Sequence, residues 1–211
     1  MKFSYFSNHI NSLKTNELGG RSSQFKLVPE LRIKFSEEKI KDSNPKKAAV
    51  LAVLYPNKSG ESMLLLTLRA SYNGAHSAQI SLPGGKVDKV DASLKATALR
   101  EFEEEIGINR NRVQVIRQLS ETYIPPSNFM VTPFLGYLDE NPDFQPNEEV
   151  AEIIEVKVVD LIDDNLVTSV TMETSYMKKI EVPCFNFSDH IVWGATAMIL
   201  SEIKDLIKEI Q

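Results

Sequence analysis

Three glutamates, Glu101, Glu104 and Glu105, have the residue types and spacing in this sequence that are best suited to chemistry. They belong to the run Arg100-Glu101-Phe102-Glu103-Glu104-Glu105-Ile106-Gly107. Residues three or four apart share one face of a helix, so a helix here gathers the three carboxylates. Their repulsion, added to the negative end of the helix dipole, is costly without a cation. Because Mg²⁺ and Mn²⁺ prefer oxygen ligands, the cluster indicates a divalent-metal site.

A solvated helix face is the alternative interpretation of the same acids. Arg100 would then pair with Glu103 or Glu104 and contribute only a few tenths of a kcal/mol. The segment Leu82-Pro83-Gly84-Gly85 just before the helix favours the metal site. Its proline and glycines predict a sharp, irregular backbone that lets the main chain approach a ligand closely.

The element that positions the acids is a helix predicted over residues 92–106. Apolar residues recur at four-residue spacing and form its inward face, and they are Leu94, Ala98, Phe102 and Ile106. Asp91 or Ser93 can cap the free N–H groups at its start. Gly107 takes the position after the last turn that glycine favours.

Strands and helices alternate along the rest of the chain, which predicts an α/β fold with a mixed sheet. Residues 48–55 form a short apolar run typical of a buried central strand, and residues 62–69 complete a hairpin with it. Further strands are expected at 113–119, 131–138 and 150–159, and an amphipathic helix at 195–210. A short amphipathic helix is expected over 3–13.

The composition is that of a single globular domain. The 211 residues are 42% hydrophobic and carry a net charge of −5, with no lysine and arginine block to follow a phosphate backbone. We therefore expect residues 41–211 to form the domain, residues 1–40 to pack on it as a helix and extension, and nucleic acid not to be a partner. The single cysteine, Cys184, and the lack of a long apolar stretch indicate a cytoplasmic protein without a membrane span. A homodimer is left open.

The loop and helix together resemble the Nudix box. The residues that carry the resemblance are Gly85, Asp91 and the run from Arg100 to Ile108. The run matches the second half of the box in full. In the first half, Asp91 stands where Glu is usual, and one extra residue separates it from Arg100.

The resemblance implies a Nudix-type α/β/α sandwich and hydrolysis of a phosphoanhydride bond with Mg²⁺ or Mn²⁺. Glu101 and Glu105 would be the principal metal ligands, assisted by Glu104 and the Gly85 carbonyl, while Arg100 would hold the carboxylates in place. Glu104 is one candidate for the catalytic base. The acids Glu149 and Glu152 of a later segment are the others, as ligand or base, although they could equally face solvent on an edge strand.

Flanking segments resemble coenzyme A pyrophosphatases, a Nudix subgroup. The segments are residues 65–70, 76–86, 122–129 and 190–197. That subgroup also tends to carry Asp in place of Asp91 and the extra residue before Arg100. The resemblance implies cleavage of coenzyme A, or of its thioesters, into 4′-phosphopantetheine and adenosine 3′,5′-bisphosphate.

Arg69, His76 and Lys86 are the candidate residues for binding the phosphates of this nucleotide substrate. Each also has a plain structural interpretation, as a surface charge or a hydrogen-bonding histidine. Two other functions remain open from the sequence. One is a Nudix hydrolase for ADP-ribose or another dinucleotide, because the box handles only the shared diphosphate. The other is a regulator that binds a nucleotide without cleaving it, which would predict the loss of a metal-binding acid.

Overall fold

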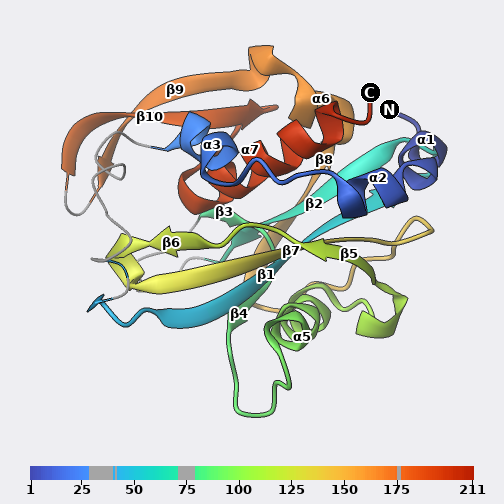
Figure 1. The fold of residues 1–211 in the computed structure, drawn as a ribbon, viewed down its shortest axis with the longest axis horizontal. Helices are drawn as coiled ribbons and strands as arrows, with labels where there is room; N and C mark the ends of the chain where they lie inside the picture. Colours follow the sequence, from blue (N-terminus) through green and yellow to red (C-terminus); the bar gives the residue numbers. More distant parts are fainter. Residues whose placement is uncertain (29–39, 41, 71–78, 175–176) are drawn as a thin grey trace.

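The computed structural model describes residues 1–28, 40, 42–70, 79–174 and 177–211. A mixed β-sheet lies between helices on its two faces, as Figure 1 shows. The α/β fold with a central mixed sheet is therefore confirmed. The strands of this sheet are β1 (Lys46–Pro56), β2 (Ser62–Arg69), β3 (Ile80–Ser81), β4 (Gly84–Lys86), β5 (Gln114–Gln118), β6 (Thr122–Ile124), β7 (Phe129–Tyr137) and β8 (Val150–Lys157).

Strand β1 is the centre of the sheet, in the order β3-β2-β1-β7-β5. It pairs antiparallel with β2 through a short turn, which confirms the predicted hairpin. On its other side it runs parallel to β7, and its first half also pairs antiparallel with β4. Strand β8 covers the outer edge of β2, and β6 lies against β7. The pairing places the loop around Gly84 directly beside the central strand.

Two hydrophobic cores lie on opposite faces of the sheet. On one face, Leu51 and Leu65 pack with Phe102 and Ile106 of helix α5 (Leu94–Ile106). On the other face, the alternate residues of β1 and β2 pack with the long helix α7 (Gly194–Lys208). Each large apolar side chain buried in this way contributes about 1.5–3 kcal/mol. Both faces of β1 are covered, which explains its continuous apolar sequence.

The N-terminal segment is broken into short helices where the sequence predicted one helix over 3–13. The helices are α1 (Phe3–Asn8), α2 (Ile10–Thr15), α3 (Gly20–Gln24) and the single 3₁₀ turn η1 (Phe25–Leu27). The predicted apolar face is nevertheless buried, since Phe3, Phe6 and Leu13 belong to the core that α7 covers. The division of the chain at residue 40 stays a prediction.

A second, three-stranded sheet was not predicted. It consists of β9 (Val167–Thr174), β10 (Met177–Phe187) and β11 (His190–Trp193), with the short helix α6 (Val158–Ile162) before it. The threonines and serines of β9 and the Pro183 of β10 weaken the apolar pattern that marks a strand. Among the described residues, no helix is both long and apolar enough to cross a membrane.

Candidate active site

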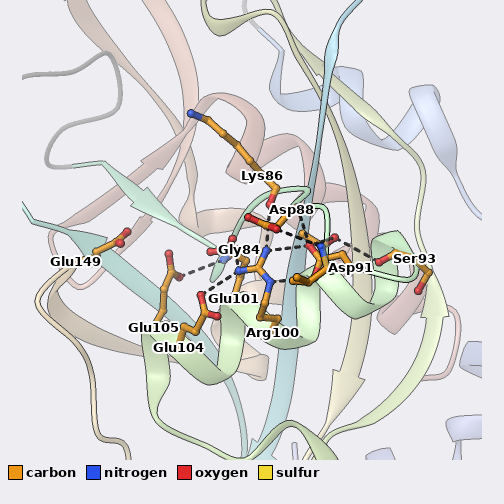
Figure 2. A network of polar contacts seen from close by, with 12 residues as sticks. Gly84, Lys86, Asp88, Asp91, Ser93, Arg100, Glu101, Glu104, Glu105 and Glu149 are labelled. Atoms are coloured by element: carbon orange, nitrogen blue, oxygen red, sulfur yellow. Dashed lines mark hydrogen bonds and ion pairs between the residues drawn. The ribbon is translucent and has the colours of Figure 1, made fainter.

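Helix α5 holds the acidic cluster with both ends capped as the sequence predicted. The Ser93 hydroxyl accepts a hydrogen bond from the Ala96 N–H at 3.1 Å, and Gly107 closes the helix with a left-handed φ of 75°. Ala98, Phe102 and Ile106 are fully buried against the sheet. This anchoring fixes the rotation of the helix, so that Glu101 and Glu105 lie beside the loop at Gly84 (Figure 2).

Arg100 is the hub of the polar network in Figure 2. Its Nε donates to Asp91 Oδ1 at 2.9 Å, and its Nη1 lies 2.9 Å from Glu101 Oε1 and 3.0 Å from Glu104 Oε2. Its Nη2 also donates to the Lys86 carbonyl at 3.2 Å. One guanidinium therefore ties the loop to two of the clustered acids. Charge-assisted hydrogen bonds of this kind are strong, and they also hold the carboxylates in a defined orientation.

Glu103, by contrast, faces Arg110 and takes no part in this network. The four glutamates of the helix therefore have two different surroundings. Glu101, Glu104 and Glu105 face the loop, while Glu103 belongs to an ordinary surface ion pair at the end of the helix. Of the two pairings that the sequence offered for Arg100, the one with Glu104 is present, while Glu103 pairs with Arg110.

Glu105 is the most buried acid of the cluster. Its Oε2 accepts the Gly84 N–H at 3.1 Å, and its Oε1 lies 3.3 Å from Arg69 Nη1. Burial raises the pKa of Glu105 to about 7, outweighing the opposite effects of Arg69 and the Gly84 amide. Burial also raises the pKa of Glu101, against the pull of Arg100. Both carboxylates are therefore held where negative charge is costly.

The two glycines of the loop lie close to their neighbours, Gly84 to the backbone of β1 and Gly85 to the carboxylate of Glu101. A Cβ on Gly85 would lie 2.5 Å from the carboxyl carbon of Glu101. A Cβ on Gly84, whose φ is 151°, would lie 2.3 Å from the Ala49 carbonyl oxygen. Gly84 thus lets the loop lie against the central strand, and Gly85 lets the Glu101 carboxylate lie against the loop.

The donor set of this cluster is suited to a hard divalent cation. Within the described part of the chain, no three Asp, Glu, His or Cys side chains converge as a ready-made ion site. The carboxylates of Glu101 and Glu105 are instead held by Arg100 and Arg69, one helical turn apart beside the same two glycines. The buried Glu105 and the half-buried Glu101 both have raised pKa values and offer only oxygen donors, which fits Mg²⁺ or Mn²⁺.

The two acids of the later segment lie in different surroundings. Glu149 Oε2 is 3.4 Å from Arg69 Nη2, so one arginine links it to Glu105. Glu152 Oε1 is 3.4 Å from His190 Nε2 of β11. Since side chains alternate along β8, Glu152 shares the face of Ile154, which packs in the core under α7. The structure brings Glu149 to the cluster and places Glu152 toward the opposite face.

The three candidate substrate residues also differ in placement. Arg69 lies between Glu105 and Glu149, at the end of β2. Lys86 gives its carbonyl to Arg100, while its side chain extends away from the acids (Figure 2). His76 lies outside the described residues. Sequence reasoning left the role of Asp91 open and missed the Gly84 N–H, for which the only signal was the loop itself.

The fold and this site together define an α/β/α protein whose Gly-Gly loop leads into a capped acidic helix. The family model described as the NUDIX domain matches residues 45–170. The chain therefore belongs to the Nudix hydrolase family, whose members generally use divalent metal ions.

Two relatives illustrate the similarity. Over 85% of this chain and 94% of its own length, an uncharacterized Nudix hydrolase NudL of Photorhabdus laumondii is 30% identical. Nudix hydrolase 22, chloroplastic, of Arabidopsis thaliana is 36% identical over 74% of this chain, and the match spans only 53% of that plant protein. The fold is similar to the crystal structure of the M. smegmatis Nudix hydrolase RenU, with a TM-score of 0.55, 18% identity, and coverage of 79% of this chain and 88% of that one.

Proposed function

We propose that this protein hydrolyses the diphosphate of coenzyme A or acyl-coenzyme A, releasing 4′-phosphopantetheine or its acyl form and adenosine 3′,5′-bisphosphate. The observation that supports a hydrolase most strongly is the pair of carboxylates beside Gly84 and Gly85, the buried Glu105 and the half-buried Glu101. Repulsion and burial raise the pKa of both groups. A metal–diphosphate complex would relieve this cost.

We assign each residue of the site a role from its position. Glu101 and Glu105 would hold Mg²⁺ or Mn²⁺ together with Glu104, the Gly85 carbonyl and, through its link to Arg69, Glu149. When bound, such an ion neutralises phosphoryl oxygens and makes a water molecule more acidic. Arg100 orients Glu101 and Glu104 from the loop side.

Glu104 is the favoured catalytic base. Its side chain is 53% exposed, so it can meet a water molecule, and Arg100 fixes its carboxylate. Glu152 is the other candidate base that the sequence suggests. Its pairing with His190 argues against this role. Arg69 lies between the carboxylates of Glu105 and Glu149. Its guanidinium could bind phosphate oxygens of the substrate in place of these carboxylates.

Coenzyme A is the favoured substrate because the flanking segments resemble its pyrophosphatases, and the described parts of these segments contact one another or the acidic cluster. Arg69 of the first segment contacts Glu105. Ile80 of the second accepts a hydrogen bond from the Thr196 hydroxyl of the last at 3.1 Å. Lys86 of the second lies over the Phe129 ring of the third. These contacts link all four segments to the catalytic loop or to the acidic helix, which supports a role for them in one binding site.

Product analysis tests the proposal. The protein is incubated with Mg²⁺ or Mn²⁺ and, separately, with coenzyme A, acetyl-coenzyme A, ADP-ribose and diadenosine polyphosphates. We expect 4′-phosphopantetheine and adenosine 3′,5′-bisphosphate from coenzyme A. Cleavage of ADP-ribose with coenzyme A intact would contradict the substrate, and cleavage of no anhydride would favour the nucleotide-binding regulator. The cytoplasmic location and a homodimer stay predictions.

A further inference from the structure

Two lysines share one aromatic ring beside the catalytic loop. The Nζ atoms of Lys86 and Lys46 lie 5.7 Å and 6.0 Å from the centre of the Phe129 ring. The ring is half-buried and both lysines are exposed. Within the described ranges, neither ammonium group has a carboxylate partner. Two like charges gathered at one ring without a counter-charge form a place suited to an anion next to a flat group.

Three neighbouring strands build this arrangement. Lys46 of β1 is directly opposite Phe129 of β7, and Ala48 of β1 is directly opposite Lys86 of β4. Since side chains alternate along β1, Lys46 and Ala48 share a face, and their partners lie on that same face. The small side chain of Ala48 leaves Lys86 free to reach over β1 to the ring.

Asn128 fixes the backbone on which the ring stands. Its Oδ1 accepts hydrogen bonds from the Ser43 and Tyr123 hydroxyls, both at 2.9 Å, and its Nδ2 donates to the Ser43 carbonyl at 2.8 Å. Its own carbonyl accepts the Lys46 N–H at 2.9 Å. These bonds hold a left-handed φ of 51° just before Phe129. The ring and Lys46 are thus positioned by rigid structure.

We call Phe129, Lys46 and Lys86 the platform. Lys86 connects it to the acids, because its backbone lies next to the acidic cluster and its side chain reaches the ring. The Lys86 carbonyl accepts from Arg100, and the preceding Gly85 touches the Glu101 carboxylate. The Lys86 side chain leaves in the other direction (Figure 2). Along β1 the platform shares the face of Ala52 and Leu54, which α7 covers, and the acids lie on the α5 face. A nucleotide whose diphosphate lies at the acids would therefore reach the platform by passing around strand β4, where Gly85 faces the acids and Lys86 faces the ring.

We propose that the platform binds the adenosine 3′-phosphate end of the substrate. Phe129 stacks on the adenine, and Lys46 and Lys86 pair with the 3′-phosphate. The inference rests on the proposed function, because a 3′-phosphate on the adenosine distinguishes coenzyme A from ADP-ribose and dinucleoside polyphosphates. The platform would thus be the part of the site that selects the substrate, while the acidic helix cleaves it.

Binding of two products or product analogues tests the platform without any turnover. Adenosine 3′,5′-bisphosphate and AMP share the nucleoside and the 5′-phosphate, and neither contains an anhydride. We expect calorimetry on the wild-type protein to show tighter binding of the bisphosphate, by about tenfold or more. Lys46→Gln and Lys86→Gln should each remove most of that preference. Phe129→Leu should weaken both nucleotides alike.

Lys58→Gln is the matched control, since Lys58 is exposed in the turn between β1 and β2. It removes the same charge and should keep the preference. The two lysine variants change exposed side chains, so their folding is not at risk, and thermal melting checks the ring variant. Equal binding of both nucleotides by the wild type, or an unchanged preference in both lysine variants, would overturn the inference.

Hydrolysis of coenzyme A and of dephospho-coenzyme A separates the inference from the proposed function. The platform predicts a higher kcat/KM for coenzyme A, which Lys46→Gln lowers through KM. Hydrolysis of both compounds at equal kcat/KM, unchanged in the lysine variants, would refute the platform and leave the hydrolase intact. A bisphosphate preference that the lysines control, without any coenzyme A hydrolysis, would refute the proposed function and leave the platform standing.

Discussion

The Arg100 guanidinium donates two hydrogen bonds to the Asp91 carboxylate, from Nε to Oδ1 and from Nη2 to Oδ2, each 2.9 Å long. Asp91 Oδ2 also accepts from the Asp88 N–H at 2.8 Å and the Thr97 hydroxyl at 2.9 Å. The loop is thereby locked to the middle of the helix. Asp91, irregular in the general Nudix box, is a structural anchor for the arginine that orients the acids.

Asp91→Asn should destabilise the protein. The substitution removes the charge of one partner of a bidentate, partly buried ion pair, and the Asn side chain can accept only one of the two hydrogen bonds from Arg100. We expect the free energy of unfolding to fall by about 2 kcal/mol, as measured by urea denaturation. Asp189→Asn is the control, because Asp189 is exposed at a turn with a φ of 74°, which Asn also tolerates. An equal loss in both variants would contradict the anchoring role.

Acid should unfold the wild type partly through Asp91. The hydrogen bonds from Arg100 hold the pKa of Asp91 well below its ordinary value of 3.8. The stabilisation is therefore fully present above that value and is lost as the pH falls below it. Between pH 5 and pH 3, the wild type should lose more unfolding free energy than Asp91→Asn does. Parallel curves for the two proteins would show that Asp91 has no such role.

Glu104→Gln should abolish most of the turnover while the fold stays intact. If Glu104 is the base, kcat should fall by roughly 10²–10⁴-fold, and its exposure predicts an unchanged melting temperature. Glu103→Gln is the matched control on the same helix, since Glu103 faces Arg110. That variant should stay within about twofold of the wild type. Near-normal kcat in Glu104→Gln would move the base to another acid, with Glu152→Gln as the next variant to measure.

The two loop glycines should respond differently to alanine. In Gly84→Ala the new Cβ meets backbone atoms of Ala49 and Val50, which cannot move away, so the melting temperature should drop sharply. In Gly85→Ala it meets only the flexible carboxylate end of Glu101. That variant should fold with nearly normal stability and bind Mn²⁺ at least several-fold more weakly. Similar stability of the two variants would contradict the packing of the loop.

Glu105 should make the metal-free protein sensitive to alkali. Its pKa of about 7 in the folded state lies above the ordinary value of 4.5, so its stabilising contribution is complete below 4.5. It is lost as the pH rises through about 7. With a chelator, the wild type should lose on the order of 2 kcal/mol between pH 5 and pH 8.

Mg²⁺ and a Gln variant provide the controls for this pH dependence. An ion that binds only the folded state stabilises it in proportion to its occupancy, and deprotonated ligands bind it best. Millimolar Mg²⁺ should therefore offset the loss at pH 8, and Glu105→Gln should show neither the pH slope nor the full Mg²⁺ response. An identical slope in Glu105→Gln would assign the pH dependence to another group.

The sequence by itself determined the elements that carry local signals. Strand β2 and the buried central strand follow from their apolar runs, and helix α5 follows from its four-residue period, Ser93 and Gly107. These signals are legible because hydrogen bonding within a helix and alternation along a strand depend on near neighbours. The acidic face of α5 was predictable for the same reason, since helical spacing alone places Glu101 and Glu105 together.

Only the tertiary structure decided which distant residues meet. The parallel pairing of β1 with β7 brings Lys46 beside Phe129, and no local pattern encodes that register. Likewise, the alternation of side chains along β8 directs Glu152 toward His190. Glu149 lies in the turn before β8 and contacts Arg69 instead. The chain must first bury its apolar faces against α5 and α7, and this packing then fixes which charges face one another. The sequence thus determined the catalytic helix, and the packing of the sheet decided the surroundings in which it works.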